Sequence, residues 1–477
     1  MESHLPESPR TASATPRLET MDVEPLMTRD YETRPAFVYE RLRAKYGPVA
    51  PVDLYGLKIW LVLGYQEVLE VLRNENQWKK DPKHWKALQE GRVPPDWPML
   101  AAYQVSHTLL QDDQQRKESR AAIDAALRPY QDPGQPQAAE LEAAVARQTD
   151  ELITFFADGG TTGWADLSAE FARPLPLLVI NRLFGFPVEQ TDDIFMDAWR
   201  MMDSGPDAAE AIGRLNTATS QLAAYKRKNP GDDLTSRLIE AGPHLSDEQI
   251  GLELYAMLIY SDHITQSITH TVLEVLTGNT RAQASLSVGT FHELVNRVHI
   301  ASPPWRNLAL RYPVSDVVLG DFHIAAGDVV MPSVAAAHGD PMFAKALNDD
   351  SVMSTRAHLA WGAGPHQCPS RDLAEMVSTT AVSRLFERCD LELGLPVDQL
   401  PWRSSSYIRG LKSFPVKYTM RQLPPGARPD LSTPVTPAPA AEPGGGEPES
   451  PAQPQQRPRS RLWRFLASLR GGANPRN

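Results

Sequence analysis

The sequence contains few cysteines and no long apolar run. Two cysteines occur among 477 residues, and neither belongs to a Cys-x-x-Cys pair or a cysteine/histidine cluster. This scarcity excludes a disulfide framework and a structural zinc site, and it favours a reducing compartment. No apolar run reaches the length of about 18 residues that a membrane helix needs, and the N-terminus lacks the apolar core of a signal peptide. We therefore expect a cytoplasmic protein without a membrane span.

Two further absences limit the function. The net charge of -11 argues against non-specific binding to nucleic acid. No glycine-rich flavin or nicotinamide fingerprint follows a predicted strand, since the closely spaced glycines, Gly362 and Gly364, precede a cysteine instead. Any redox chemistry of this chain would thus need electrons from another protein.

Composition divides the chain into four parts. The N-terminal part is rich in Ser, Pro, Thr and Glu, which predicts disorder. A domain with enough apolar residues for a large core follows, and after it comes a Pro/Gly-rich linker that cannot pack a core. The expected bounds are 1–24 for the disordered N-terminus, 25–422 for the domain, 423–458 for the linker and 459–477 for a basic tail.

The basic tail has the pattern of an amphipathic helix. Four apolar residues fall at i, i+3, i+4 and i+7 among arginines, with no acidic residue nearby: Leu462, Phe465, Leu466 and Leu469. A helix of about ten residues is marginal in water, so it would form on a membrane surface or on a protein partner. The tail would then hold the protein peripherally at the inner membrane face, although disorder throughout is equally compatible with the sequence.

Helical patterns dominate the domain. Residues 52–65 alternate around Tyr55 and Gly56, which predicts a β-hairpin, and short β-branched runs at 314–334 predict further strands. A long apolar helix is expected from a Ser246 cap to Thr277. The expected fold class is mainly α with small β-sheets (α+β) rather than alternating βαβ.

The segment around Cys368 carries the strongest chemical signal. Gly362 and Gly364 permit backbone conformations that let the chain pass close to something flat or bulky. Pro369 suits the first turn of a helix, which would place Cys368 at the positive end of a helix dipole and favour its thiolate. The simpler alternative is that Cys368 is a small buried apolar residue at a helix start.

The stretch from Trp361 to Cys368, W-G-A-G-P-H-Q-C, resembles the haem-binding loop of the cytochrome P450 family, whose pattern is F-G-x-G-x-H-x-C-x-G. The resemblance covers residues 25–422 and implies the cytochrome P450 fold, with a long central helix and a cysteine loop over haem b (iron protoporphyrin IX). It implies that Cys368 is the axial thiolate ligand of the iron and that His366 contacts a haem propionate. Trp361 keeps an aromatic ring near the sulfur and adds an indole N–H, whereas Ser370 replaces the usual glycine.

The same resemblance implies three arginine contacts to the haem propionates. Arg116 and Arg120 occupy the two places of the family's H-x-x-x-R pair, and Arg311 precedes the predicted strands. Arginine forks suit carboxylates, so the change from histidine to arginine keeps a cation at the first place. Taken alone, each of these arginines would be expected on the surface.

The central helix departs from the family's A-G-x-(D/E)-T motif, which delivers protons to iron-bound oxygen. His263 takes the place of the acid and Ile264 that of the threonine. Asp262 and Thr265 lie one residue to either side, and a helix turns by about 100° per residue, so neither side chain points where the usual group does. Either a shifted pair or His263 itself relays protons, or His263 is a core histidine and Thr265 caps a carbonyl.

The E-x-x-R pair of the family is also missing. Glu293 is followed by Asn296 three residues later and by Arg297 four residues later; an E-x-x-x-R pair can still form on one helix face, and the usual network is either absent or rebuilt. This loss, together with the W-G-A-G-P-H-x-C-P loop, resembles one divergent actinobacterial branch of the family.

These features predict a haem-thiolate monooxygenase that inserts one oxygen atom from O₂ into an apolar small molecule. Electrons would come from an external ferredoxin and ferredoxin reductase, and six basic residues would form the acidic ferredoxin's docking surface: Arg116, Lys117, Arg120, Arg371, Arg384 and Arg388. The alternative is a haem protein with impaired oxygen activation that acts as a sensor or regulatory partner. Turnover driven by peroxide alone would indicate a peroxygenase.

Overall fold

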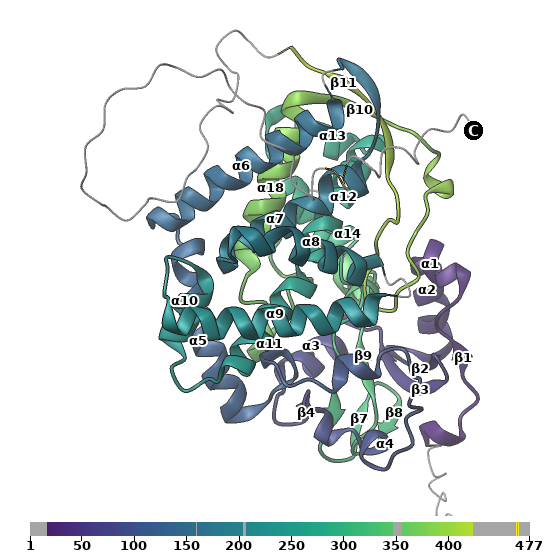
Figure 1. Cartoon of the computed structure of the whole chain (residues 1–477). Helices are drawn as coiled ribbons and strands as arrows, with labels where there is room; N and C mark the ends of the chain where they lie inside the picture. The colour runs from purple at the N-terminus through teal and green to yellow at the C-terminus, as the bar shows by residue number, and fades with distance from the viewer. Residues whose placement is uncertain are drawn as a thin grey trace, which may run out of the picture.

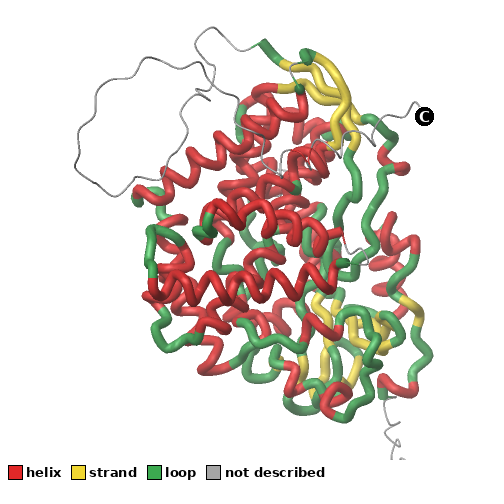
Figure 2. Tube along the Cα trace, in the orientation of Figure 1, coloured by secondary structure: helices red, strands yellow, loops and turns green. Residues whose placement is uncertain are grey.

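The computed structural model describes residues 17–158, 160–203, 207–346 and 355–422, together with Arg464 and Leu466. Helices make up most of the described chain, as Figures 1 and 2 show. Their bounds are α1 Arg29–Thr33, α2 Pro35–Tyr46, α3 Tyr65–Arg73, α4 Lys86–Gln89, α5 Asp113–Gln131, α6 Pro136–Ala157, α7 Pro174–Phe184, α8 Val188–Asp203, α9 Ala208–Lys228, α10 Leu234–Ala241, α11 Asp247–Tyr260, α12 Asp262–Leu276, α13 Thr280–Val288, α14 Phe291–Ala301, α15 Val334–His338, α16 Pro341–Ala346 and α18 Arg371–Arg388.

Short strands form four small sheets at two ends of the helical body (Figure 2). One sheet has the order β1-β2-β3-β9, a second has the order β10-β11-β5, and the pairs β4-β6 and β7-β8 complete the set. The strand bounds are β1 Glu24–Pro25, β2 Val49–Leu54, β3 Leu57–Val62, β4 Trp78–Lys79, β5 Thr162–Asp166, β6 Tyr312–Pro313, β7 Val317–Leu319, β8 Phe322–Ile324, β9 Val330–Pro332, β10 Cys389–Leu393 and β11 Pro415–Met420. The predicted class, mainly α with small sheets, is confirmed.

The predicted hairpin at residues 52–65 corresponds to β2 and β3, which pair antiparallel. Tyr55 and Gly56 both have positive φ angles, of 55° and 87°, as a tight two-residue turn between twisted strands requires. The expected single helix from Ser246 to Thr277 is instead divided at Ser261 into α11 and α12. The Ser261 hydroxyl donates to the Leu258 carbonyl at 2.6 Å, and this local bond competes with the helical hydrogen-bond ladder at the break.

The central part of the core is built around α12. Every residue from Asp262 to Val272 is buried, although many of them are polar. The helix packs against α14 and α18, and α18 also packs against α6. This arrangement places α12 beside the segment that carries Cys368.

The ends of the chain are described only in part. Residues 1–16 lie outside the described part, whereas Leu18 is buried and β1 pairs with β2, so packed structure begins before residue 25. The predicted linker and most of the basic tail also lie outside the described residues. Within the tail, Leu466 is fully buried in the main apolar cluster and Arg464 is exposed. Among the described helices, none is long and apolar enough to cross a membrane.

Candidate functional site

The residues from 357 to 370, called the cysteine loop below, lead into α18. The Cys368 N–H donates to the Trp361 carbonyl at 2.8 Å, which closes the loop on itself. Gly362 and Gly364 have φ angles of 71° and 69°, in the left-handed region that favours glycine. Both glycines therefore adopt backbone conformations of the kind that the sequence pattern predicts.

Gly364 also lies against α3, and this contact yields a prediction. A Cβ atom at this position would lie 2.7 Å from the Leu72 carbonyl oxygen, whereas a Cβ at Gly362 would meet its nearest atom at 3.6 Å. We expect Gly362→Ala to cost about 1 to 2 kcal/mol of unfolding free energy for the left-handed backbone alone. Gly364→Ala should cost about 1 to 3 kcal/mol more, because the loop or α3 backbone must also shift to relieve the contact with the Leu72 carbonyl. Denaturant unfolding of the two apo-proteins measures the difference, and equal costs would contradict the close approach.

The environment of Cys368 differs from the prediction in one respect. Helix α18 begins at Arg371 rather than at Pro369, so the sulfur does not lie in the first helical turn. Burial raises the pKa of the Cys368 thiol, although the Ser370 hydroxyl, 3.5 Å from Sγ, acts in the opposite direction. Burial therefore outweighs the groups that favour the free thiolate, which include the Ser370 backbone N–H. A bound cation can still deprotonate this thiol outright.

Trp361 connects the cysteine loop to α18. Its indole N–H, which the sequence identified as an added donor, gives a hydrogen bond of 3.0 Å to Oε1 of Glu375. Arg371 donates to the same oxygen at 3.1 Å. The Trp361 ring is buried, so this polar contact satisfies a donor that would otherwise be costly to bury.

Arg116 and Arg120 reach the cysteine loop but are already paired. Arg116 forms an ion pair with Glu75 at 2.7 Å and donates to the Pro365 carbonyl at 3.1 Å. Arg120 pairs with Asp124 at 2.7 Å and donates to the Gln367 carbonyl at 2.6 Å. Both arginines hold carbonyl groups of the loop in place.

Arg311 and His366 have unsatisfied polar atoms. Arg311 is 2% exposed, and its Nε and Nη1 have no hydrogen-bond partner within the described chain. Burial lowers the pKa of Arg311 to about 10. The Nε2 atom of His366 likewise has no hydrogen-bond partner and lies 3.8 Å from a carboxylate oxygen of Asp112. Orphaned buried nitrogens also occur elsewhere in the described chain, for example at Nε and Nη1 of Arg409, so what distinguishes Arg311 and His366 is that they lie close to each other.

Sequence reasoning missed a further cation, Lys80. The side chain is 3% exposed, burial lowers its pKa well below the usual value, and it forms no ion pair among the described residues. Strand β4 pairs with β6 so that Lys79 faces Tyr312, which places Lys80 next to Arg311. Nothing in the sequence signals this pairing, because each strand is only two residues long.

The three candidate catalytic residues on α12 face different partners. Asp262 accepts from Gln266 at 3.1 Å and lies 3.5 Å from Arg403. His263 forms a 3.0 Å contact with His299 through the two Nε2 atoms. The Thr265 hydroxyl is buried without a hydrogen-bond partner in the described chain, so it caps no carbonyl there. The structure therefore does not bring an acid and an alcohol of α12 together as a hydrogen-bonded pair.

Comparisons with known proteins identify the family. Residues 301–404 match the sequence profile of the family described as Cytochrome P450. Cytochrome P450-SU2 of Streptomyces griseolus is 32% identical over 290 residues, which cover 58% of this chain and 70% of that protein. The chain belongs to the cytochrome P450 family. It is thus a haem-dependent monooxygenase of the oxidoreductase class, and its cofactor is haem b.

Longer matches support the same assignment. The 2-hydroxy-5-methyl-1-naphthoate 7-hydroxylase of Streptomyces carzinostaticus is 27% identical over 388 residues, covering 79% of this chain and 93% of that protein. The solved structure of CYP154A1 from Streptomyces coelicolor A3(2) has a TM-score of 0.71 and 27% identity, covering 83% of this chain and 99% of that chain. These relatives do not favour the sensor as an alternative to the monooxygenase.

The buried donors of this cytochrome P450 fit the carboxylates of haem. Arg311 and His366 have buried nitrogens without hydrogen-bond partners in the described chain, Lys80 is a buried cation next to Arg311, and a haem carries two propionates that could accept from such groups. The carboxylates of Asp112 and Glu75 lie near these cations, so a bound propionate would serve mainly the orphaned nitrogens of Arg311 and His366.

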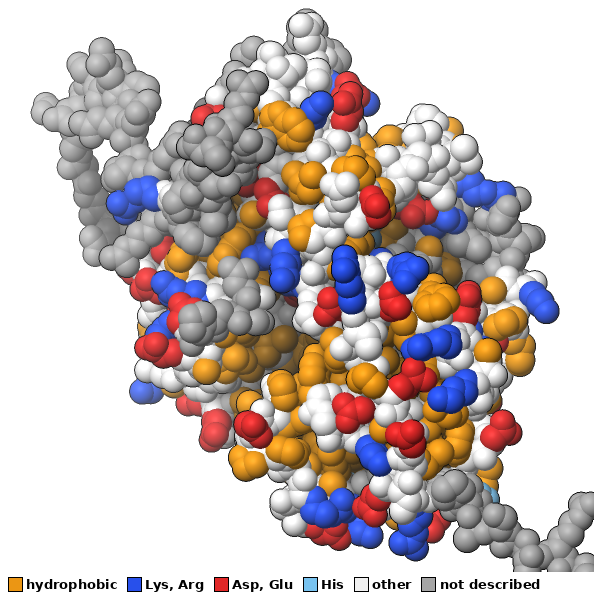
Figure 3. Space-filling model, turned by 90° about the vertical axis from the view of Figure 1, so that its right-hand side faces the viewer, with side chains coloured by type: hydrophobic (Ala, Val, Ile, Leu, Met, Phe, Trp, Pro, Cys, Tyr) orange, Lys and Arg blue, Asp and Glu red, His pale blue; other side chains and the backbone are white. Residues whose placement is uncertain are grey.

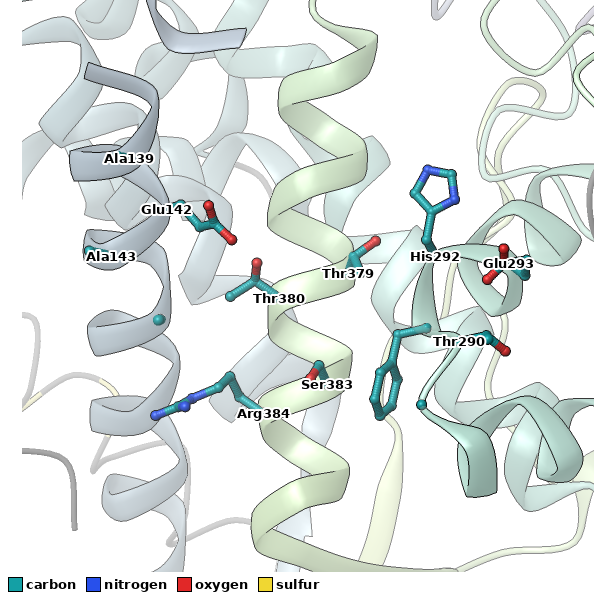
Figure 4. A pocket seen from close by; sticks show the side chains of 13 residues that line it. Ala139, Glu142, Ala143, Thr290, His292, Glu293, Thr379, Thr380, Ser383 and Arg384 are labelled. Atoms are coloured by element: carbon teal, nitrogen blue, oxygen red, sulfur yellow. The ribbon is translucent and has the colours of Figure 1, made fainter. Parts of the chain in front are cut away.

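The expected E-x-x-x-R pair does not form. Arg297 donates to Glu274 of α12 at 2.8 Å instead of to Glu293. Glu293 lies on the wall of a surface groove between α6, α14 and α18 (Figure 4). None of the predicted haem-site residues lines this groove. The Glu293–Arg297 pair that the sequence left possible is therefore not formed, and Arg297 instead links α14 to α12.

The predicted ferredoxin surface is less positive than its sequence indicates. Arg384 and Arg388 both pair with the buried Asp150, and Arg371 pairs with Glu375. Of the six basic residues, Lys117 alone has no ion pair among the described residues. On the face shown in Figure 3, basic and acidic side chains are likewise interspersed. Pairing of this kind leaves little net charge to steer a partner.

Proposed function

We propose that this cytochrome P450 inserts one oxygen atom from O₂ into an apolar small molecule, with electrons from an external ferredoxin and its reductase. The observation that carries the proposal is the cysteine loop. Its thiol is half-buried, and its two glycines adopt left-handed conformations. Two buried cations without an ion pair among the described residues, Arg311 and Lys80, lie next to each other at the paired ends of β6 and β4.

Several residues of the site would bind haem, each at a different part of the cofactor. Cys368 would be the axial ligand, Gly362 and Gly364 would let the loop backbone approach the porphyrin, and Arg311 with Lys80 would bind the propionates. His366 would contribute its free Nε2, while Arg116 and Arg120 keep the loop carbonyls fixed. Bound haem supplies the oxygen chemistry, which a thiolate ligand favours by pushing electron density onto iron.

A buried aromatic cluster joins the segment between α3 and α5 to Tyr312 of β6. The ring centroids of Trp85 and Trp97 lie 5.5 Å apart, and Trp85 stacks on Tyr312 at 5.7 Å. The hydroxyls of Tyr103 and Tyr407 contact each other, and burial raises the pKa of Tyr103 to about 12. These hydroxyls therefore stay neutral at physiological pH.

Proton delivery would differ from the usual arrangement of the family. Asp262 is held by Gln266 and Arg403, so the free hydroxyl of Thr265 is the group on α12 best able to pass a proton. Because Ile264 occupies the family's alcohol position, we propose that Thr265 acts through water.

Turnover with a surrogate ferredoxin and reductase tests this function. We expect NADPH-dependent, O₂-dependent formation of a hydroxylated product when a library of apolar compounds is offered, with candidates chosen by a shift of the Soret band on binding. Thr265→Val should lower the yield of product per electron consumed, whereas Thr269→Val, whose hydroxyl already bonds the Thr265 carbonyl at 3.1 Å, should not. A haem-loaded protein that binds ligands but never forms product would favour the sensor, and turnover with peroxide alone would favour a peroxygenase.

A further inference from the structure

Three aromatic side chains, one of them from the cysteine loop, meet where this loop packs against two helices. His263 of α12 and His299 of α14 stack at 5.1 Å between ring centroids. The Trp361 ring lies 4.3 Å from His263 and 4.7 Å from His299. All three side chains are buried. The central helix, α14 and the loop that precedes Cys368 are therefore joined at one point.

Further neutral contacts join α14 to the start of the loop. His358 stacks parallel to His299 at 6.0 Å, and its Nε2 lies 3.2 Å from the side-chain oxygen of Asn296. Asn296 stands where the family's E-x-x-R motif has arginine. One residue further along the loop, the Leu359 N–H donates to Nε2 of His338 at 2.8 Å, and Nδ1 of His338 contacts the Ile300 carbonyl at 3.0 Å.

Four buried histidines near the cysteine loop are uncharged at physiological pH: His263, His299, His338 and His358. Burial lowers the pKa of His263 and of His338 to about 3 and that of His358 to about 4. Because the two Nε2 atoms of His263 and His299 face each other, one must donate and the other must accept. Nδ1 of His299 has no partner in the described chain, so a proton on Nε2 of His299 avoids burying an unpaired N–H.

We propose that His263, His299 and Trp361 form a neutral lock that replaces the missing E-x-x-R pair and holds the cysteine loop against α12 and α14. His263 is thereby a positioning residue, committed to the loop rather than to proton delivery. This inference rests on the proposed function, since the lock acts by keeping Cys368 ready to ligate iron. The ring contacts among the three members carry no charge and are insensitive to salt, whereas the bond from the Trp361 N–H goes to the charged Glu375.

The test compares His299→Phe with His270→Phe in the reconstituted full-length protein. His270 is an equally buried histidine of α12, but it contacts Ser302 and Trp402 rather than the cysteine loop. The readout is the ratio of thiolate-ligated to thiol-ligated haem in the carbon monoxide complex, read from the two Soret bands. We expect His299→Phe to lower this ratio about five-fold or more, the factor that one lost buried hydrogen bond gives. His270→Phe should leave the ratio at the wild-type value.

Two more variants keep the test decisive. His299→Gln retains a side-chain N–H and should restore part of the ratio, even where His299→Phe folds poorly. The double variant His263→Phe/His299→Phe should lose no more than the worse single variant, because both remove the same hydrogen bond. An unchanged ratio in His299→Phe, additive losses in the double variant, or an equal loss in His270→Phe would overturn the lock. Wild-type protein that never shows the thiolate band would instead overturn the proposed function itself.

Discussion

Cys368→Ala is expected to abolish the red-shifted Soret band that thiolate ligation gives to the carbon monoxide complex, whereas Cys389→Ala should retain it. The two cysteines form a matched pair, because both are free and no other cysteine exists in the sequence. Cys389 is fully buried, lies 3.5 Å from the sulfur of Met420, and belongs to the strand that follows α18. As for Cys368, burial raises its pKa, here to about 12.

The expected loss in Cys368→Ala is complete, because the other cysteine of the sequence, Cys389, lies on the strand after α18 rather than in the cysteine loop. Unfolding of both apo-variants by denaturant serves as the control for general damage. Retention of the thiolate band in Cys368→Ala, or its disappearance in Cys389→Ala with the apo-protein still folded, would contradict the assignment of the ligand.

Arg311→Met should separate haem affinity from the stability of the apo-protein. The buried guanidinium has two N–H groups without acceptors, so hydrogen bonds to a propionate would add directly to haem binding. Because Arg311→Met removes these charge-assisted hydrogen bonds, we expect it to weaken haem binding about ten-fold to a hundred-fold. The apo-protein should be no less stable, because removing an unpaired buried cation also removes the cost of burying it.

Arg306→Met provides the contrasting variant. Arg306 is 1% exposed, but its Nη1 donates to the Tyr31 carbonyl at 2.9 Å, so its loss should destabilise the apo-protein without a selective loss of haem. Haem affinity is measured by transfer to an acceptor apo-protein, and stability by denaturant unfolding. Equal haem affinity in wild type and Arg311→Met would contradict the role given to Arg311.

Local patterns were sufficient to predict the parts of the fold whose cause is local. The positive φ angles at Tyr55 and Gly56 follow from a tight turn between two alternating runs, and the left-handed glycines of the cysteine loop follow from their spacing before Cys368. The break at Ser261 was not predicted. The apolar pattern continues through it, and the side-chain bond to Leu258 that accompanies it has no signature in composition.

The partners of the charged residues could not be predicted, because they lie far away in the sequence. Arg116 pairs with Glu75, and Arg384 pairs with Asp150. Both arginines looked available for a cofactor or a redox partner until these carboxylates were placed beside them. The raised pKa of Cys368 has the same origin, since it depends on how deeply the assembled chain buries the sulfur.

The carbon monoxide difference spectrum of the reduced, haem-reconstituted wild-type protein tests the central claim most directly. The account predicts a single red-shifted Soret band, because the sulfur of Cys368 binds iron as an anion. A colourless protein after reconstitution, or a band only at the shorter wavelength of a neutral ligand, would contradict it.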